Sequence, residues 1–189
     1  MKKSPGVAAL LVAVMAAACL FFPAIVNSRY HSQLAVCQNK MKGIGQALVS
    51  YSQSDERRMF PVIPKEGKLS VAGVYAPVLV ENGLIEDSDV FYCPAKNQTV
   101  VLRIPHSKDV LSAEGNQLVS LHRTMGGDYA YTLGFVKDGR LQGIRNLDRT
   151  HYPVLSDEPQ EELTNSVISS HGRGQNVLFE DGHVAFLST

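Results

Sequence analysis

The sequence lacks an excess of basic charge and has few cysteines, and each shortage excludes a class of protein. Lysine plus arginine and aspartate plus glutamate are equal, at 18 each, whereas a nucleic-acid-binding domain usually gathers basic residues on one face. The three cysteines, Cys19, Cys37 and Cys93, are too few and too scattered for a zinc module or a disulfide-dense mini-protein. A chain of 189 residues suits one domain with an appendage, and we expect no nucleic-acid partner.

Charged residues are also missing between Gly6 and Val26. As a helix, this stretch would be about 31 Å long, which matches a bilayer core of about 30 Å. Two lysines precede it and favour a cytoplasmic N-terminus, so the rest of the chain would lie outside the cytoplasm. We therefore predict a short cytoplasmic leader at 1–5 and a single transmembrane helix at 6–26.

Two other N-terminal signals compete with a retained anchor. A cleaved signal peptide would use the small residues of AAACLFFPA as its cleavage site, but its apolar core would be shorter. A lipoprotein would be cut before Cys19, where the apolar run Leu-Phe-Phe is an unusual continuation. The pattern favours a retained anchor over both.

Apolar residues continue beyond this stretch at alternating steps of four and three: Tyr30, Leu34, Cys37, Met41, Ile44, Leu48 and Tyr51. This spacing is typical of a helix with one apolar face, so we expect 27–54 to be an amphipathic continuation of the same helix. The face would meet another chain if the helix were a coiled-coil stalk. Gly43 and Gly45 weaken a helix but admit a close neighbour, which favours packing against the protein's own head.

The remaining residues, 55–189, predict a globular head. A short helix is expected over roughly Val71 to Asn82, with Gly83 as its stop. The segment 106–128 mixes polar residues with glycines and shows no clear period, so we expect a loop with fragments of structure there.

Several short runs in the head predict strands. YAYTLGF and HYPVLSDE are β-branched or aromatic runs bounded by Gly, Pro and Asp. At the C-terminus, NVLFE and HVAFL flank Asp181 and Gly182. Asp-Gly between two alternating apolar runs predicts a β-hairpin with a type I′ turn, which needs positive φ at both central residues.

His171, Asp181 and His183 have side chains that suit a metal site. However, the short turn between Asp181 and His183 restricts their convergence, and no fourth ligand is apparent. We expect Asp181 to be a turn residue that faces solvent and His171 to lock its loop by hydrogen bonding. Since no Gly-x-Ser-x-Gly elbow accompanies them, a hydrolase is disfavoured, and we predict no metal, no cofactor and no enzymatic activity.

The C-terminal pattern of a histidine, nine residues and Asp-Gly, carried by His171, Asp181 and Gly182, resembles the signature of a large group of pilin-like proteins. The segments VFYCPA and YAYTLG also resemble segments of that group. The helix resembles the group's helix, which usually has a Cys, Asn and Lys, then an Ile-Gly-x-Ala-Leu run, a Tyr and a closing Phe-Pro. The residues that carry this match are Cys37, Asn39, Ile44, Gly45, Ala47, Leu48, Tyr51, Phe60 and Pro61.

This resemblance covers most of the chain and implies a pseudopilin, a non-enzymatic α+β protein. Its long N-terminal helix would lie half in the membrane and pack on a small antiparallel sheet. Its partners would be membrane lipid and other pilin-like subunits, contacted through the N-terminal helix. The resemblance implies a subunit of a type II secretion or type IV pilus-like apparatus, in the bacterial inner membrane with a periplasmic head.

One position departs from the family pattern. Members usually carry a Gly-Phe-Thr-Leu-Ile-Glu-type processing site, cut after Gly, and Gly6 is the corresponding residue here. Leu11 takes the place of the glutamate, and the first acidic residue of the chain is Asp55. In a fibre that glutamate is thought to pair with a neighbour's terminal amine, because an unpaired charge in lipid is costly. A subunit without it would stand at the fibre tip or not polymerise, and the latter would suit an anchored ligand-binding domain on a pilin fold.

Cys37 and Cys93 would both lie outside the cytoplasm, where a disulfide is permitted. Cys37 is on the apolar helix face and Cys93 follows the predicted short helix, so a bridge would staple the helix to the head. A loop of this length would contribute about 4 kcal/mol if unstrained. The alternative is a pair of buried thiols that act as small hydrophobic side chains, and the sequence leaves both open.

Overall fold

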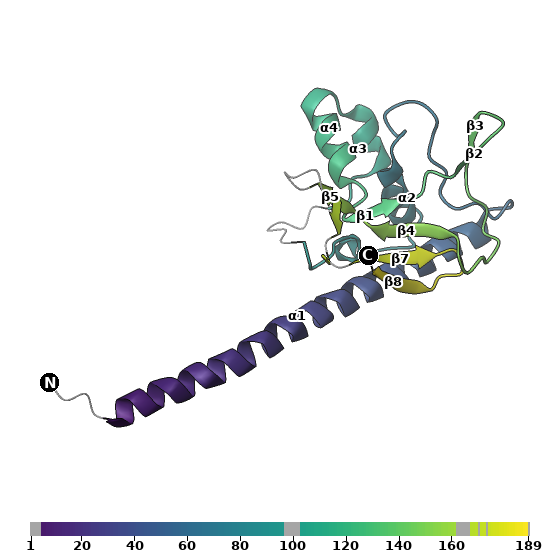
Figure 1. Ribbon diagram of the computed structural model, residues 1–189. Coiled ribbons are helices and arrows are strands. Elements are labelled where there is room, and N and C mark those ends of the chain that lie inside the picture. The colour runs from purple at the N-terminus through teal and green to yellow at the C-terminus, as the bar shows by residue number, and fades with distance from the viewer. Residues whose placement is uncertain (1–4, 97–102, 162–166, 170, 173, 189) are drawn as a thin grey trace.

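The computed structural model describes residues 5–96, 103–161, 167–169, 171–172 and 174–188, and the side chains of 5–9, 12, 13, 20, 159–161 and 167–169 are outside that description. The chain is α+β, as predicted: a long N-terminal helix carries a head built around a small antiparallel sheet (Figure 1). The helices are α1 (Pro5–Ser54), α2 (Tyr75–Glu81), α3 (Ser107–Ser112) and α4 (Gly115–Thr124), with 3₁₀ turns η1 (Ala72–Val74) and η2 (Ser88–Phe91).

The strands form one larger sheet and two small antiparallel pairs. The four-stranded sheet has the order β1 (Tyr129–Tyr131), β4 (Pro153–Asp157), β7 (Gly174–Phe179) and β8 (Val184–Ser188), and every neighbouring pair is antiparallel. The chain leaves this sheet twice, through the hairpin β2 (Phe135–Lys137) and β3 (Arg140–Gln142) and through the pair β5 (Pro159–Glu161) and β6 (Val167–Ser169). The β2–β3 hairpin projects from the head (Figure 1).

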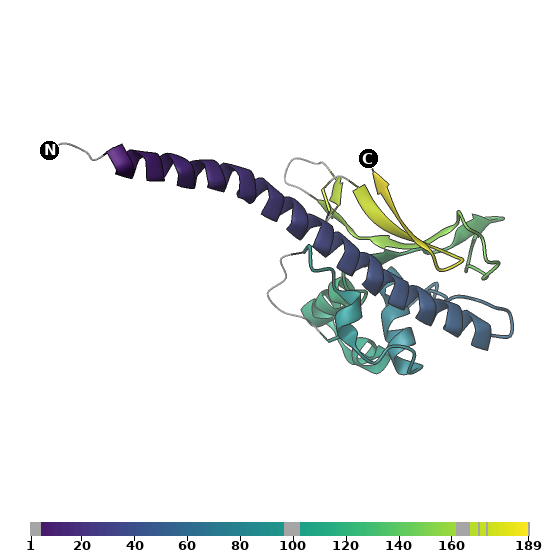
Figure 2. The ribbon, with the colours of Figure 1, turned by 90° about the horizontal axis from the view of Figure 1, so that it is seen from below.

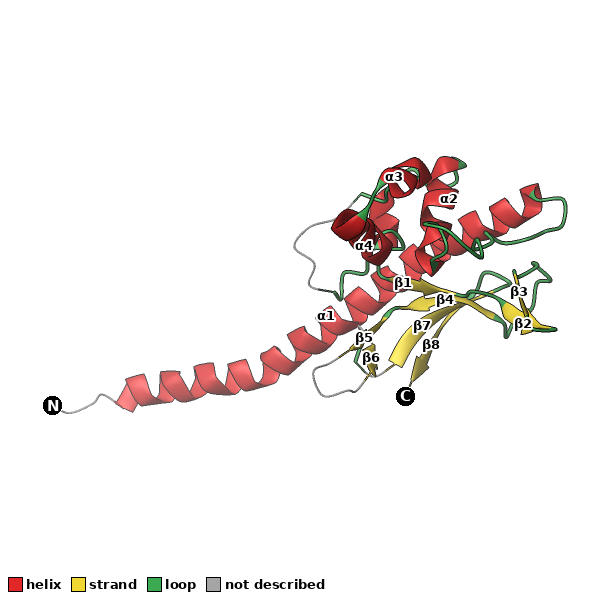
Figure 3. Cartoon of the chain, turned by 90° about the horizontal axis from the view of Figure 1, so that it is seen from above, coloured by secondary structure: helices red, strands yellow, loops and turns green. Residues whose placement is uncertain are grey.

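Helix α1 is continuous over 50 residues, and Pro23 lies inside it. Its N-terminal half extends away from the head, whereas its C-terminal half lies between the sheet and the small helices (Figures 2 and 3). The helix ends at Ser54 because Asp55 turns the chain back. The Asp55 carboxylate accepts hydrogen bonds from the N–H groups of Arg57 (2.9 Å) and Met59 (3.1 Å), and Arg58 adopts a positive φ of 56°.

The predicted apolar face of α1 is confirmed, and it packs on the protein's own head. Cys37, Met41, Ile44 and Leu48 are fully buried, and the flanking stripe residues are half-buried. This face contacts η2, α2, β7 and β8. Burying a Met, Ile or Leu side chain stabilises a fold by about 1.5–3 kcal/mol, so Met41, Ile44 and Leu48 contribute strongly to holding helix and head together.

Aromatic side chains link the small helices to the sheet in the core. Tyr75 of α2 stacks on Tyr131 of β1 with ring centroids 4.8 Å apart and meets Phe91 edge-on at 6.0 Å. Their hydroxyls are satisfied, because Tyr75 donates to the Gly126 carbonyl (2.9 Å) and Tyr131 donates to the Pro61 carbonyl (3.0 Å). Buried phenol groups need such partners, and these bonds fix the position of the chain that leaves α1.

The short helix predicted at Val71 to Asn82 is found as η1 followed by α2, and Gly83 ends it with a positive φ of 67°. The segment 106–128, expected to be a loop with fragments of structure, is mostly helical, since α3 and α4 occupy most of it. Both helices are short and largely exposed, with few residues facing the core. A stretch of two or three turns with so little buried surface leaves hardly any apolar period to detect.

The predicted C-terminal hairpin is present as β7 and β8, but the predicted two-residue type I′ turn is wrong. Three residues, 180–182, separate the closing pair, in which the Phe179 N–H donates to the His183 carbonyl (2.9 Å). The Gly182 N–H donates to the Phe179 carbonyl (2.9 Å), and Gly182 alone of the two predicted central residues has a positive φ, 87°. This is the three-residue loop in which a type I turn precedes a left-handed glycine.

Searched over the residues that the structure describes, no helix is both long and apolar enough to qualify as a membrane span. The predicted leader at 1–5 falls almost wholly outside the description, as do several side chains of the predicted span at 6–26. Gly6 belongs to the first turn of α1. The anchor therefore stays a prediction.

The two glycines of the helix face provide a matched test of its packing. A Cβ at Gly45 would lie 2.7 Å from the Cδ1 of buried Leu178, whereas a Cβ at Gly43 would lie an ordinary 3.5 Å from Val90. Alanine favours the helix over glycine by about 1 kcal/mol. We expect Gly43→Ala to raise the free energy of unfolding by about 0.5–1 kcal/mol and Gly45→Ala to lower it by about 1–2 kcal/mol. Urea unfolding of both variants measures this, and equal effects would contradict the described docking of α1 on β7.

Candidate functional site

The structure separates the three residues that suit a metal. His171 is buried before β7, whereas Asp181 and His183 pair with each other at the opposite end of that strand, with Asp181 Oδ1 2.5 Å from His183 Nδ1. Within the described part of the chain, the one trio of potential ligands that converges is Cys37, Cys93 and His171. Asp181 is a turn residue, as expected, and its carboxylate also accepts from the His183 N–H (3.2 Å).

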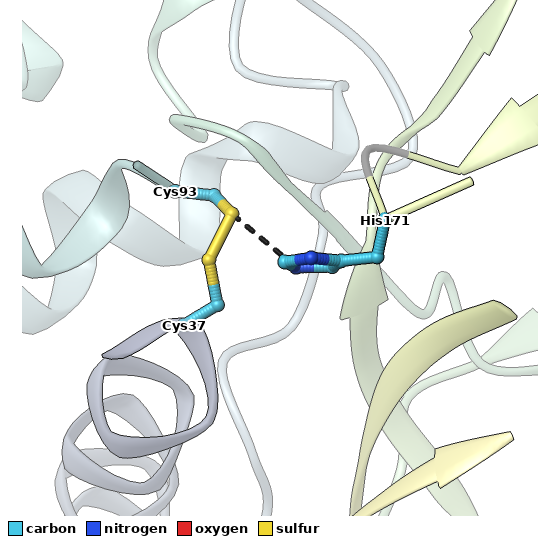
Figure 4. Close-up of side chains that lie close together, drawn as sticks. All are labelled: Cys37, Cys93 and His171. Atoms are coloured by element: carbon cyan, nitrogen blue, oxygen red, sulfur yellow. Dashed lines mark hydrogen bonds between the residues drawn. A yellow bond between two sulfur atoms is a disulfide. The ribbon is translucent and has the colours of Figure 1, made fainter. Parts of the chain in front are cut away.

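Cys37 and Cys93 form a disulfide in the structure, with Cα atoms 5.3 Å apart and a sequence separation of 56. Of the alternatives that the sequence left open, the structure contains the bridge. It joins the buried face of α1 to the segment that follows η2 (Figure 4). Cys19, the remaining cysteine, is exposed on the projecting half of α1.

His171 lies against this disulfide from the side of the sheet (Figure 4). Its Nε2 is 3.5 Å from Cys93 Sγ and 3.6 Å from Asp157 Oδ2, and only 4% of the residue is exposed. A disulfide sulfur and a carboxylate oxygen are both acceptors, so a ring proton on Nε2 suits these two contacts. His171 thus connects the bridge to the end of β4.

Asp157 is a member of this cluster that the sequence reasoning missed. It ends β4 and is 1% exposed, and its Oδ2 accepts a 2.6 Å hydrogen bond from the N–H of Asn176 in β7. The available signal was an acidic residue directly after the apolar run of a strand, in the predicted segment HYPVLSDE. Buried carboxylates are rarely tolerated without partners, and such a position therefore indicates an internal contact.

Burial sets the protonation of the two titratable groups. It lowers the pKa of the His171 imidazole and raises the pKa of the Asp157 carboxyl, while the attraction between them opposes both shifts. The imidazole is therefore neutral at neutral pH. A neutral ring suits the apolar contact with the disulfide, since a charged one would need stronger solvation than this site offers.

A second buried acid holds the Cys93 segment. Asp128 Oδ2 accepts a 2.8 Å hydrogen bond from the Cys93 N–H, and Asp128 Oδ1 lies 3.3 Å from Lys96 Nζ. Burial raises the pKa of Asp128, and the Cys93 N–H and Lys96 oppose that rise. From the other side, Lys40 of α1 donates to the Tyr92 carbonyl (3.0 Å). The backbone at Cys93 is thus fixed between the head and α1.

The far end of β7 depends on Glu180 rather than on its neighbour Asp181. Glu180 is 1% exposed; its carboxylate accepts hydrogen bonds from the Leu147 N–H and from Arg149 Nε, the latter at 2.6 Å. The Arg149 guanidinium also lies 4.0 Å above the centre of the Tyr152 ring. Sequence alternation gave no signal for Glu180, because its partners come from a loop that precedes β4.

A groove of about 680 Å³ lies at the junction of α1 and the head. It is lined mainly by aromatic and apolar side chains of α1, with His171 and Gly172 on the opposite wall. Comparison of this chain with protein-family models, curated proteins and solved structures finds no match.

Removing the His171 side chain should destabilise the head. His171→Ala would open a cavity beside the disulfide and leave the Asp157 carboxylate without its imidazole neighbour, so we expect a loss of about 2–3 kcal/mol in the free energy of unfolding. His183→Ala is the control, since that ring is 46% exposed and its pair with Asp181 is worth less than about 1 kcal/mol. An unchanged denaturation midpoint for His171→Ala would refute a structural role for this ring.

Stability should also depend on pH through His171. Its pKa in the folded state is below the ordinary value of 6.5, so the unfolded chain binds the proton first as the pH falls. With the disulfide intact, we expect the free energy of unfolding to decline below about pH 6.5, by at most about 1.4 kcal/mol per pH unit. Denaturation of the wild type and of His171→Gln between about pH 7.5 and 5.5 tests this, because the decline should be smaller in the variant.

Proposed function

We propose that the protein is a membrane-anchored, pilin-like (pseudopilin) assembly subunit of a type II secretion or type IV pilus-like apparatus, with the head on the extracytoplasmic side. The observation that carries this proposal is the half of α1 that leaves the head with its apolar side chains uncovered. Between 52% and 69% of each of the following residues is exposed: Leu10, Leu11, Val14, Met15, Phe21, Phe22, Ile25 and Val26. A large exposed apolar surface of this kind calls for lipid or other helices to cover it.

The firm attachment of the other half supports an assembly role. The buried helix face and the Cys37–Cys93 disulfide hold the head to α1 on different elements. A head fixed in this way keeps a constant position relative to the apolar half, which a subunit that packs through its helix requires. The disulfide also agrees with an oxidising, extracytoplasmic location.

Leu11 supports a place at the tip of a fibre. It is 59% exposed among other apolar residues, where the pilin-like pattern has a glutamate that pairs with a terminal amine. The described helix carries no acidic residue, so this subunit would have nothing to offer the amine of a subunit above it. Packing of its apolar helix against subunits below would be unaffected.

A second candidate function is ligand binding by a pilin fold that does not polymerise. The groove of about 680 Å³ between α1 and His171 favours it, since its size suits a small molecule. The two functions differ in one respect: an assembly subunit has protein neighbours along α1 in the membrane, whereas a ligand-binding domain that does not polymerise has none.

Cys19 allows a direct test, because it is an exposed thiol on the projecting half of α1. Thiol-directed crosslinking in native membranes should join the protein through Cys19 to other pilin-like subunits, identified by mass spectrometry, and Cys19→Ser should abolish the adducts. Protein that stays uncrosslinked would favour the ligand-binding alternative. Intact mass of the same sample measures processing: loss of six residues would place the cleavage after Gly6 despite Leu11.

A further inference from the structure

When its disulfide is reduced, the cluster of Cys37, Cys93 and His171 has the donor atoms of a metal site. Both sulfurs and one imidazole nitrogen lie within 4.8 Å of one another, and all three residues are buried. They come from α1, from the segment after η2 and from the entry to β7, so their convergence is a product of the tertiary fold. Two thiolates and an imidazole form a donor set that zinc prefers.

Asp157 lies next to His171, outside the trio whose atoms are all within 4.8 Å of one another, and is a candidate fourth donor. Its Oδ2 lies 3.6 Å from His171 Nε2, and the residue is 1% exposed. Its Oδ1 is buried and, within the described part of the chain, has no hydrogen-bond partner. A buried carboxylate oxygen without a partner is costly, and coordination of a cation would satisfy it directly or through a bound water.

The ligand spacing fits a tetrahedral ion. With zinc–sulfur bonds of about 2.3 Å and zinc–nitrogen bonds of about 2.0 Å, a sulfur and a nitrogen ligand of one ion stand roughly 3.5 Å apart. The distance from Cys93 Sγ to His171 Nε2 is 3.5 Å. The two sulfurs are too close for ligands of one ion, since they are bonded to each other. Opening that bond is therefore the main change that the site needs.

We propose that the reduced protein binds a divalent metal ion of the zinc class through Cys37, Cys93 and His171, with Asp157 completing the site. A dithiol supplies two electrons and two protons, the Cys37–Cys93 bond breaks, and the dithiol becomes a disulfide. The ion then displaces the protons of both thiols, and His171 coordinates through Nε2 with its proton on Nδ1. Oxidation reverses the sequence, because the two sulfurs bond to each other, the electrons pass to the oxidant and the ion leaves without changing its own oxidation state.

The ion and the disulfide would thus be alternative crosslinks between α1 and the head, formed by the same two cysteines. Each ties α1 to the head, and a newly made chain with reduced cysteines would have the metal crosslink before oxidation forms the covalent one. This inference does not depend on the proposed function, since it concerns the attachment of the helix and not its partners.

Cobalt(II) provides the probe. The full chain, carrying Cys19→Ser to remove the third thiol, is reduced with a phosphine and titrated with cobalt(II). We expect one equivalent to bind, with the thiolate charge-transfer and intense visible bands of a tetrahedral site, and zinc(II) to displace it. The oxidised protein should show neither band.

Variants of the ligands should change this result. His171→Ala and the double variant Cys37→Ser, Cys93→Ser should lose the bands, and Asp157→Asn should weaken cobalt(II) binding roughly 10–100-fold. His183→Ala, at an exposed histidine, should bind cobalt(II) as the parent does.

Reduced protein that keeps its circular dichroism but shows no such bands overturns the proposal, and so do bands of equal strength in His171→Ala. If reduction unfolds the head, zinc(II) should restore its near-ultraviolet dichroism in the reduced parent and not in the cysteine double variant. Failure of zinc(II) to restore it would equally overturn the proposal.

Discussion

The attachment of a very long helix to a small head is the constraint on which the rest of the structure depends. The N-terminal half of α1 extends away from the head (Figures 2 and 3), so the C-terminal half must bind the head strongly enough to fix its position on the helix. Close approach at Gly45, where Leu178 leaves no room for a Cβ, brings β7 directly onto the helix. The disulfide at Cys37 then fixes the helix at a second point, toward its projecting half.

The spacing of the C-terminal motif has a physical explanation in this arrangement. His171 and Asp181 stand at opposite ends of β7, so the nine intervening residues span the strand and its two connections. At one end His171 contacts the disulfide and Asp157. At the other, Glu180 binds Arg149 while Asp181 and Gly182 form the turn. The motif therefore secures the strand that packs on α1.

What could be predicted from the sequence was governed by local periodicity. The helix face of α1 and the hairpin flanking Asp181 have regular apolar spacing, so both were predicted, although the turn type was not, because Glu180 faces inward and lengthens the loop. The short helices α3 and α4 bury too little to show a period. Asp157 was missed because its partners, His171 and Asn176, are brought to it only by the pairing of β4 with β7.

The proposed assembly role follows from the contrast between the two halves of α1. One half has a narrow apolar stripe, matched by the head, and polar residues elsewhere; the other exposes apolar side chains all around. A stripe suffices where one side meets protein and the other meets water, whereas a helix that is apolar all round belongs among lipids or other helices. Because the helix is continuous through Pro23, the apolar half is joined without a break to the half that packs on the head. That continuity is what an assembling subunit requires, and a ligand-binding head on a passive anchor would not need it.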